Sequence, residues 1–205
     1  MARIGYTIDM KTFLFLLLIV VIVLAAALKL MTRKTTDPNQ RFAEYQQVLV
    51  QLEQAYPNPL SEEDHAAAME RFGRLWSDLS GEQVRAHARS IYAEDVWFND
   101  TVKTLRGGEA VADYLQHTAD RVDACTVTFD QVMRAGADTF VRWTMVVLTT
   151  GSREEDGMVS CGITHMRFNE QGQVVLHQDF WDPAGGLYEH IPGVRWVIQQ
   201  VRARL

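Results

Sequence analysis

Two carboxylates and one imidazole are the residues of this sequence best suited to proton-transfer chemistry. On a strand predicted over residues 174–181, a period of two places His177 and Asp179 on one face. A carboxylate beside an imidazole can act as a general base, and apolar surroundings would raise its pKa. Asp100 follows a short predicted strand and supplies a second carboxylate. Two carboxylates in one apolar pocket push their pKa values apart, which suits acid/base catalysis.

Further residues are expected to line the same pocket. Trp181 continues the strand face of His177 and Asp179, and two residues of the preceding predicted strand share one face by the same alternation. The predicted lining residues are Asn99, Arg142, Thr164, Met166 and Trp181.

Each candidate also has a purely structural interpretation. Asp100 could cap the turn before Arg106, and His177 could be a half-buried sheet residue with one hydrogen bond. Asp179 on an apolar strand needs a partner, because an unpaired buried carboxylate is costly. Arg142 or His177 could be that partner in a structural pair, so the residues alone leave catalysis and structure open.

The sequence contains none of the common cofactor motifs. It has no glycine-rich nucleotide loop, no metal-ligand cluster and no GxSxG nucleophile motif, so we predict chemistry without a cofactor or metal. Cys125 and Cys161 are the only cysteines. They are predicted to be small, half-buried apolar residues, with a single disulfide as the alternative if the body lies in an oxidising compartment.

The elements that must position these residues change type along the chain. Helices are predicted over 38–56, after a Ser61 capping box, near 81–92 and after Gly108. Period-two segments follow, and they predict strands over 125–133, 139–149, 157–168 and 174–181. This order predicts an α+β fold in which a curved antiparallel sheet packs on helices.

The last residues, 191–205, are predicted to form an amphipathic helix. Its valines fall on one side, and Arg195, Arg202 and Arg204 fall largely on the other. We expect this helix to pack on the sheet, with contact between its arginines and anionic lipid headgroups as the alternative.

The amino terminus predicts a membrane anchor. Residues 13–28 contain no polar side chain, and the stretch 12–31 is long enough to cross a bilayer. We therefore divide the chain into an anchor (1–34), a juxtamembrane helix and linker (35–60) and a body (61–205). A cleaved signal peptide is the alternative, because three alanines occur at 25–27. The basic residues after the span favour a single-pass protein of the cell inner membrane with a cytoplasmic body.

Composition separates the anchor from the body. The 205 residues carry a formal charge of −6, divided between +4 in residues 1–34 and −10 in the remainder. A hydrophobic content of 47% is enough to close a core, which excludes a mainly disordered chain. The acidic body excludes a nucleic-acid-binding protein, which needs a basic face for phosphates.

Two stretches resemble a known superfamily. YAEDVWFND at 92–100, followed by RGGEAV at 106–111, is similar to a segment of ketosteroid isomerases and SnoaL-like cyclases. ITHMRFNEQGQV at 163–174, running into HQDFWD at 177–182, is similar to their last two strands. The resemblance covers residues 64–190 approximately and implies the nuclear-transport-factor-2-like fold, a conical α+β barrel with one deep pocket. It leaves a homodimer as an option that this chain alone does not decide.

Some functional residues of the family are matched in this sequence and others are replaced. Asp100 matches the catalytic base of ketosteroid isomerases, and Asp179 matches the acid/base aspartate of SnoaL-like cyclases and of limonene-epoxide-hydrolase-like enzymes. Thr164 replaces the protonated aspartate of the isomerase oxyanion hole, and residues 71–73 lack its tyrosine. The hydrolases also need an Arg-x-Asp, whereas residues 142–144 read Arg-Trp-Thr.

Three functions follow from the resemblance. The first is a membrane-tethered protein that binds a small hydrophobic molecule and acts on it as an isomerase, cyclase or dehydratase. The second is a non-catalytic dimeric scaffold of a membrane complex, like a component of type IV secretion machines. The third is a lipid or steroid carrier, which needs a pocket but no acid/base pair.

Overall fold

The computed structural model describes residues 22, 38–151, 153 and 157–205. Among these residues, no helix is both long enough and apolar enough to span a membrane. The predicted span at 12–31 lies outside the described residues, apart from Ile22. By its internal contacts the chain divides into two units, 1–47 and 48–205, and the second contains the sheet and the site.

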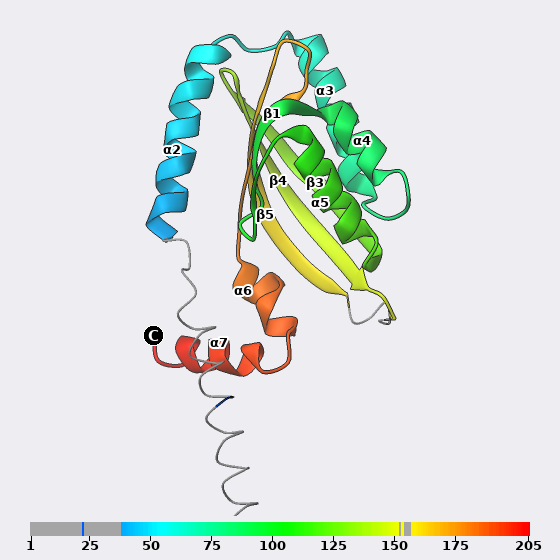
Figure 1. The fold of residues 1–205 in the computed structure, drawn as a ribbon, viewed down its shortest axis with the longest axis vertical. Helices are drawn as coiled ribbons and strands as arrows, with labels where there is room; N and C mark the ends of the chain where they lie inside the picture. The colour runs from blue at the N-terminus through cyan, green and yellow to red at the C-terminus, as the bar shows by residue number, and fades with distance from the viewer. Residues whose placement is uncertain (1–21, 23–37, 152, 154–156) are drawn as a thin grey trace, which may run out of the picture. The chain divides into compact units, whose positions relative to one another are not determined.

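Helices α3 (Glu62–Ser77), α4 (Val84–Ile91) and α5 (Gly108–Ala119) cover one side of a single sheet in the second unit (Figure 1). The other helices of the described residues are α2 (Pro38–Ala55), α6 (Pro183–Gly186), the 3-10 helix η2 (Tyr188–His190) and α7 (Val194–Arg202). The strands are β1 (Tyr92–Asn99), β2 (Thr104–Arg106), β3 (Val122–Ala135), β4 (Asp138–Thr149), β5 (Met158–Phe168) and β6 (Val174–Trp181). The prediction of an α+β fold is confirmed.

The strand order is β2-β1-β6-β5-β4-β3, which leaves the curved sheet unclosed. The prediction of a purely antiparallel sheet is wrong at one pairing, because β1 and β6 run parallel. A parallel pair needs a long crossover connection, and the chain between these two strands supplies one through α5 and four further strands.

Irregular pairing bends the sheet around its helices. The register shifts between Tyr92 and Trp97 where β1 meets β6, and again between Phe129 and Gln131 where β3 meets β4. Such bulges bend a strand and increase its local twist. The inner face therefore becomes concave, and α3, α4 and α5 pack against it (Figure 1).

Local sequence explains how these helices begin. Ser61 caps α3, because its Oγ accepts a hydrogen bond of 3.1 Å from the Asp64 backbone N–H, as the capping box predicts. Gly108 opens α5 very close to β1, where a Cβ would lie 2.8 Å from the carbonyl oxygens of Tyr92 and Ala93. Only glycine allows this approach, which brings the inner face of α5 onto the sheet.

The C-terminal helix differs from its prediction. α7 carries no buried residue, and Val197 and Val201 are 52% and 54% exposed. The expectation that this helix packs on the sheet is therefore wrong. The reason is local, because α6 and η2 turn the chain away after β6, and α7 contacts η2 instead.

A buried ionic cluster joins β4 and β5 far from the ends of the chain. Arg167, on β5, donates hydrogen bonds of 2.8 and 2.7 Å to the two carboxylate oxygens of Asp138. The ring of His165 lies 3.0 Å from the same carboxylate. Although burial raises the pKa of Asp138, its bonds to His165 and Arg167 outweigh this and lower the pKa to about 2.

Asp138→Asn is expected to lower the free energy of unfolding by about 1–3 kcal/mol at pH 7, because it leaves Arg167 buried beside a neutral group. A carboxylate whose pKa is lowered by folding stabilises the fold above its unfolded pKa, and this contribution is lost as pH falls toward 2. Urea unfolding at pH 7 and at pH 3 should therefore show a smaller difference between variant and wild type at pH 3. Equal midpoints at pH 7 would contradict the assignment.

Candidate functional site

A cavity of about 510 Å³ lies between the concave face of the sheet and helices α3 and α5. Its walls are mostly apolar, and its polar residues come from several separate segments of the chain. The apolar lining includes Phe72, Leu115, Val127, Phe129, Met145 and Val147. The polar lining includes Asp100, Tyr114, Thr164, His177 and Asp179. A volume of this size is in the range of small-molecule sites.

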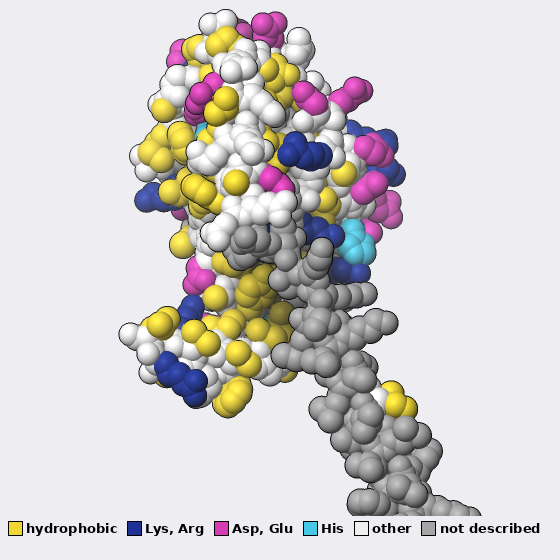
Figure 2. All heavy atoms as spheres, turned by 60° about the vertical axis from the view of Figure 1, so that its left-hand side comes forward, with side chains coloured by type: hydrophobic (Ala, Val, Ile, Leu, Met, Phe, Trp, Pro, Cys, Tyr) yellow, Lys and Arg dark blue, Asp and Glu magenta, His cyan; other side chains and the backbone are white. Residues whose placement is uncertain are grey.

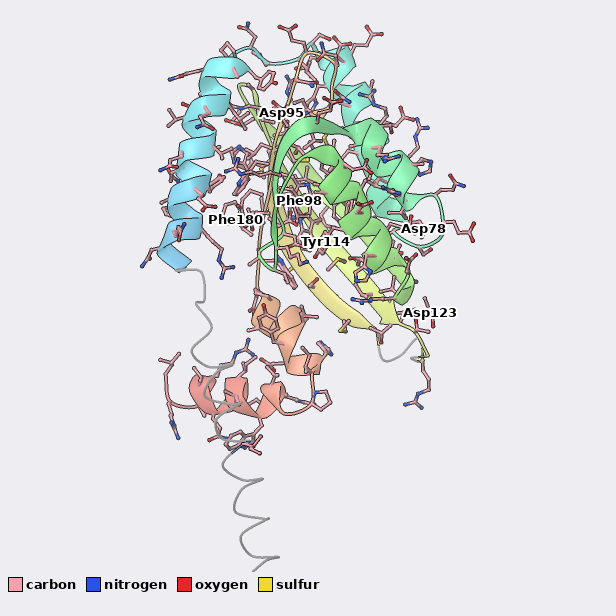
Figure 3. All side chains as sticks on the ribbon, in the orientation of Figure 1. Asp78, Asp95, Phe98, Tyr114, Asp123 and Phe180 are labelled. Atoms are coloured by element: carbon pink, nitrogen blue, oxygen red, sulfur yellow. The ribbon has the colours of Figure 1, made fainter. Side chains whose placement is uncertain are left out.

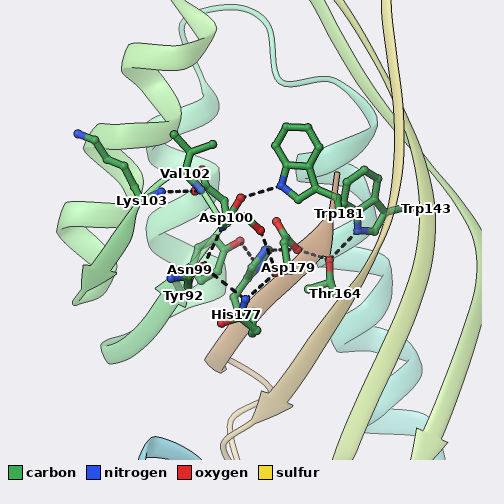
Figure 4. Close-up of polar contacts among 12 residues, drawn as sticks. Tyr92, Asn99, Asp100, Val102, Lys103, Trp143, Thr164, His177, Asp179 and Trp181 are labelled. Carbon is green, nitrogen blue, oxygen red and sulfur yellow. Dashed lines mark hydrogen bonds and ion pairs between the residues drawn. The ribbon is translucent and has the colours of Figure 1, made fainter. Parts of the chain in front are cut away.

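Asp179 is the centre of a hydrogen-bond network at the inner end of this cavity (Figure 4). Thr164 Oγ1 donates to Asp179 Oδ1 over 2.5 Å and accepts a bond of 2.8 Å from Trp143 Nε1. His177 Nε2 lies 3.1 Å from the same Oδ1. Among the described residues both bonds therefore end on Oδ1, which leaves Oδ2 able to accept a proton or hydrogen bond from a ligand.

His177 is held in one orientation from both sides. Its Nδ1 lies 3.1 Å from the Tyr92 hydroxyl, and its ring packs on Phe98 with centroids 4.6 Å apart. When the ring donates from Nε2 to the Asp179 carboxylate, Nδ1 is the nitrogen that accepts from the Tyr92 hydroxyl. The imidazole thus fixes the carboxylate in place while being buried itself.

Asp100 is placed by a strained turn between β1 and β2. Its Oδ1 accepts from the backbone N–H groups of Val102 and Lys103, and its Oδ2 accepts from the Tyr114 hydroxyl over 2.5 Å. Thr101 has φ of 76°, which is rare for a β-branched residue and costs energy. The turn-capping interpretation of Asp100 is thus confirmed, and the same carboxylate also lines the cavity.

The electrostatic environment distinguishes Asp100 from an ordinary surface carboxylate. Burial raises the pKa of Asp100, and the Asp179 carboxylate adds to the rise, while hydrogen bonds from Tyr114 and the turn oppose it. Burial and the neighbouring Asp100 carboxylate raise the pKa of Tyr114, so its hydroxyl keeps its proton at neutral pH. The site therefore combines a carboxylate acceptor with a hydroxyl donor in an apolar cavity.

The structure brings most of the sequence-predicted site residues together. Asp179, His177, Asp100, Thr164 and Trp181 all line the cavity, and the predicted common face of the last strand is confirmed. Trp181 Nε1 donates 2.8 Å to the Asp100 backbone oxygen, which ties the end of β6 to the turn.

Three predicted lining residues lie elsewhere. Arg142 is exposed, and it points to the face of the sheet opposite Trp143, so it cannot be the partner of Asp179. Met166 is fully buried in the core beside the cavity. Asn99 uses its amide within the turn, where it donates 2.6 Å to Thr104 and accepts from the Thr101 N–H.

Sequence reasoning missed two contributors to the site. Tyr92 and Tyr114 provide the groups that orient His177 and Asp100, and Trp143, which also lines the cavity, orients Thr164. The position of Trp143 depends on Gly162 across the strand, where a Cβ would lie 2.5 Å from the indole ring. In Figure 3, Tyr114 and Phe98 lie on the side of the sheet that α3, α4 and α5 cover, and Phe180 lies on the other side.

Among the residues described by the structure, no three His, Cys, Asp or Glu side chains are grouped so that they could hold a metal ion. Both cysteines are free. Cys125 is buried, with its pKa raised to about 11 by burial and by Asp78, whereas Cys161 is exposed, so the prediction of two half-buried residues is wrong for Cys161.

Comparisons with known proteins give a family model and a set of folds. The model of the SnoaL-like domain matches residues 74–177. No match to a curated protein was found. The chain is similar in structure to an epoxide hydrolase of M. tuberculosis described as LEH-like. The two sequences are 14% identical, and the structures align with a TM-score of 0.52 over 67% of this chain and 97% of that one.

Two more solved structures share the fold. One is a protein from Catenulispora acidiphila with a ketosteroid-isomerase-like fold, in complex with trimethylamine (16% identity, TM-score 0.51, covering 58% of this chain and 88% of that one). Another, from Jannaschia, is named for the SnoaL-like polyketide cyclases (14% identity, TM-score 0.50, covering 60% and 88%). At such identities the similarity establishes the fold and not the reaction.

Proposed function

We propose that this chain, which belongs to the family of SnoaL-like domains, binds a small hydrophobic molecule in its cavity and catalyses cofactor-independent acid/base chemistry on it. The reaction class is isomerisation, cyclisation or dehydration. One observation carries the proposal: a buried carboxylate, Asp179, lines an apolar cavity while His177 and Thr164 both bind the same one of its oxygens. Its other oxygen is thereby directed to a ligand.

In the proposed reaction Asp179 accepts a proton from an acidic C–H or O–H group of the ligand, and the electron pair moves into the ligand. His177 and Thr164 hold the carboxylate in position and stabilise its charge. Asp100 is the second acid/base group, and Tyr114 keeps it oriented. The proton then returns to another atom of the ligand or leaves with hydroxide as water.

The site argues against two reactions of similar folds. The indole N–H groups of Trp143 and Trp181 are both engaged within the protein, so neither can stabilise an oxyanion. Residues 142–144 place a tryptophan, with no carboxylate, beside Thr164. We therefore propose neither ketosteroid-isomerase chemistry nor epoxide hydrolysis for this chain.

A non-catalytic dimeric module or carrier is the second candidate. The outer face of the sheet exposes several large apolar side chains, which is typical of a surface that another protein covers. They are Val146, Val159, Ile163 and Phe180. A carrier would use the same cavity without proton transfer.

We further propose that residues 12–31 anchor the protein in the cell inner membrane, with the body on the cytoplasmic side. The support is the sixteen-residue apolar run at 13–28 and the basic residues that follow it. Protease protection of a tag placed after Leu205 tests the side.

Ligand binding can be tested with a hydrophobic fluorescent probe, 1-anilinonaphthalene-8-sulfonate. Val127→Trp fills part of the cavity and is expected to weaken probe binding at least about 10-fold, because the new ring takes the space of the probe. Val132→Trp, on the same strand but 45% exposed, is the matched control and should bind like wild type. Equal affinity of both variants would show that the probe, and by inference the ligand, binds elsewhere.

A further inference from the structure

We propose that α7 is a docking surface for an anionic lipid bilayer. The inference does not depend on the chemistry of the cavity or on the N-terminal segment. It begins from an apolar row on one side of the helix, formed by Val194, Val197 and Val201 at spacings of three and four. All three residues are more than one third exposed. Within the part of the chain that the structure describes, the fold does not bury this row.

The segment that contains α7 is basic, whereas the rest of the body is acidic. Residues 191–205 contain three arginines and no acidic residue, whereas residues 35–190 carry a formal charge of −13. At 100° per residue, Arg195 and Arg202 border the apolar row on one side, and Arg204 follows two residues after the end of the helix. An apolar stripe bordered by cationic residues is the pattern of helices that lie in the plane of a membrane interface. Figure 2 shows apolar side chains and arginines together on this helix.

One of these arginines fixes the helix to the domain. Arg202 pairs with Asp182, at 3.2 Å, and with Glu189. Among the described residues Arg195 and Arg204 have no acidic partner, so their charges are available to phosphate groups. Each basic residue near an anionic surface adds measurably to the attraction.

The same segment also forms part of the cavity wall. α6 follows β6 directly, and Gly186 and Leu187 line the cavity. Arg202 connects α7 to Asp182, at the start of this segment. A bilayer bound to α7 would therefore lie close to one wall of the apolar cavity.

A lipid surface fits this face better than the same face of a second copy. Two copies of residues 191–205 would bring two Arg195 and two Arg204 side chains together, and this segment contains no acidic residue to pair with them. A bilayer containing phosphatidylglycerol instead offers both an apolar interior and negative charge.

The test uses the full-length chain reconstituted into vesicles of phosphatidylcholine alone or with 30% phosphatidylglycerol, about the proportion of a moderately anionic membrane. Hydrogen exchange of residues 191–205 is read by mass spectrometry. We expect exchange to be about 10- to 30-fold slower on the anionic vesicles. Val197→Asp/Val201→Asp should remove the protection, and Arg195→Gln/Arg204→Gln should remove the difference between the two lipids. The matched control, Val146→Asp/Val159→Asp on the outer sheet face, should keep both.

Two results would overturn the proposal. Equal exchange on the two kinds of vesicle would show that anionic lipid does not bind α7. Protection that rises with protein concentration in the absence of lipid would show that another copy of the chain covers the helix. Retention of the α7 variants on the vesicles reports the N-terminal anchor separately, so failure of one proposal is distinguishable from failure of the other.

Discussion

Phe98→Ala is expected to lower the free energy of unfolding by about 3–5 kcal/mol. Phe98 is completely buried between α5 and the sheet, and its ring packs on His177, Tyr92 and Tyr114. Removing the ring loses its burial and leaves a void under the residues that orient both carboxylates. Urea unfolding monitored by circular dichroism measures the effect.

Phe180→Ala is the control for this prediction. Phe180 lies on the opposite face of the sheet and is 48% exposed, so its loss is expected to cost less than about 1 kcal/mol. The side chains removed are identical, and only their positions differ. If the two variants lost similar free energies of unfolding, the core would not lie on the side of the sheet that α3, α4 and α5 cover.

Asp179→Asn is expected to reduce turnover by about 10²- to 10⁴-fold, the usual contribution of a positioned general base. The amide keeps the shape of the carboxylate but cannot accept a proton from the ligand. Its Oδ1 can still accept from Thr164 and His177, so we expect the fold and the cavity to remain. Turnover of the molecule recovered from the purified protein, with the unfolding free energy measured alongside, separates lost chemistry from lost structure.

Lys103→Gln is a suitable control for this variant. Lys103 also lines the cavity, but its side chain lies over the Tyr114 ring and takes no part in the proposed proton transfer. We expect its turnover to stay within about 10-fold of wild type, because one cation–π contact at an exposed site contributes little. A loss equal to that of Asp179→Asn would argue against Asp179 as the base.

The part of the site on the last strand could be predicted because it depends on local alternation. The predicted strand at 174–181 has the bounds of β6, and its period of two places His177, Asp179 and Trp181 on the cavity face. The resemblance at 92–111 and 163–182 also identified the superfamily that the family model supports.

The remainder depends on contacts between distant segments. Arg142 and Trp143 are neighbours on one strand, and only the pairing of Trp143 with Gly162 decides which of them faces the cavity. Tyr114 reaches Asp100 because Gly108 lets α5 approach β1. The parallel pairing of β1 with β6 likewise joins residues about eighty positions apart, which no local pattern records.

The exposed helix α7 shows a different limit. Its amphipathic pattern was predicted from the sequence, but the same pattern suits packing on a sheet and lying on a bilayer. The surface that covers an amphipathic helix is set by where the preceding turns direct it. Here α6 and η2 direct it away from the sheet.

Deuterium incorporation into the ligand is the most direct test of acid/base catalysis by Asp179. The small molecule extracted from the full-length protein is returned to the protein in D₂O, and its mass is followed with time. We expect wild type to introduce solvent deuterium or to convert the ligand, and Asp179→Asn to do so at least about 100-fold more slowly. A ligand whose mass stays unchanged with wild type, or changes equally fast with the variant, would contradict acid/base catalysis by Asp179.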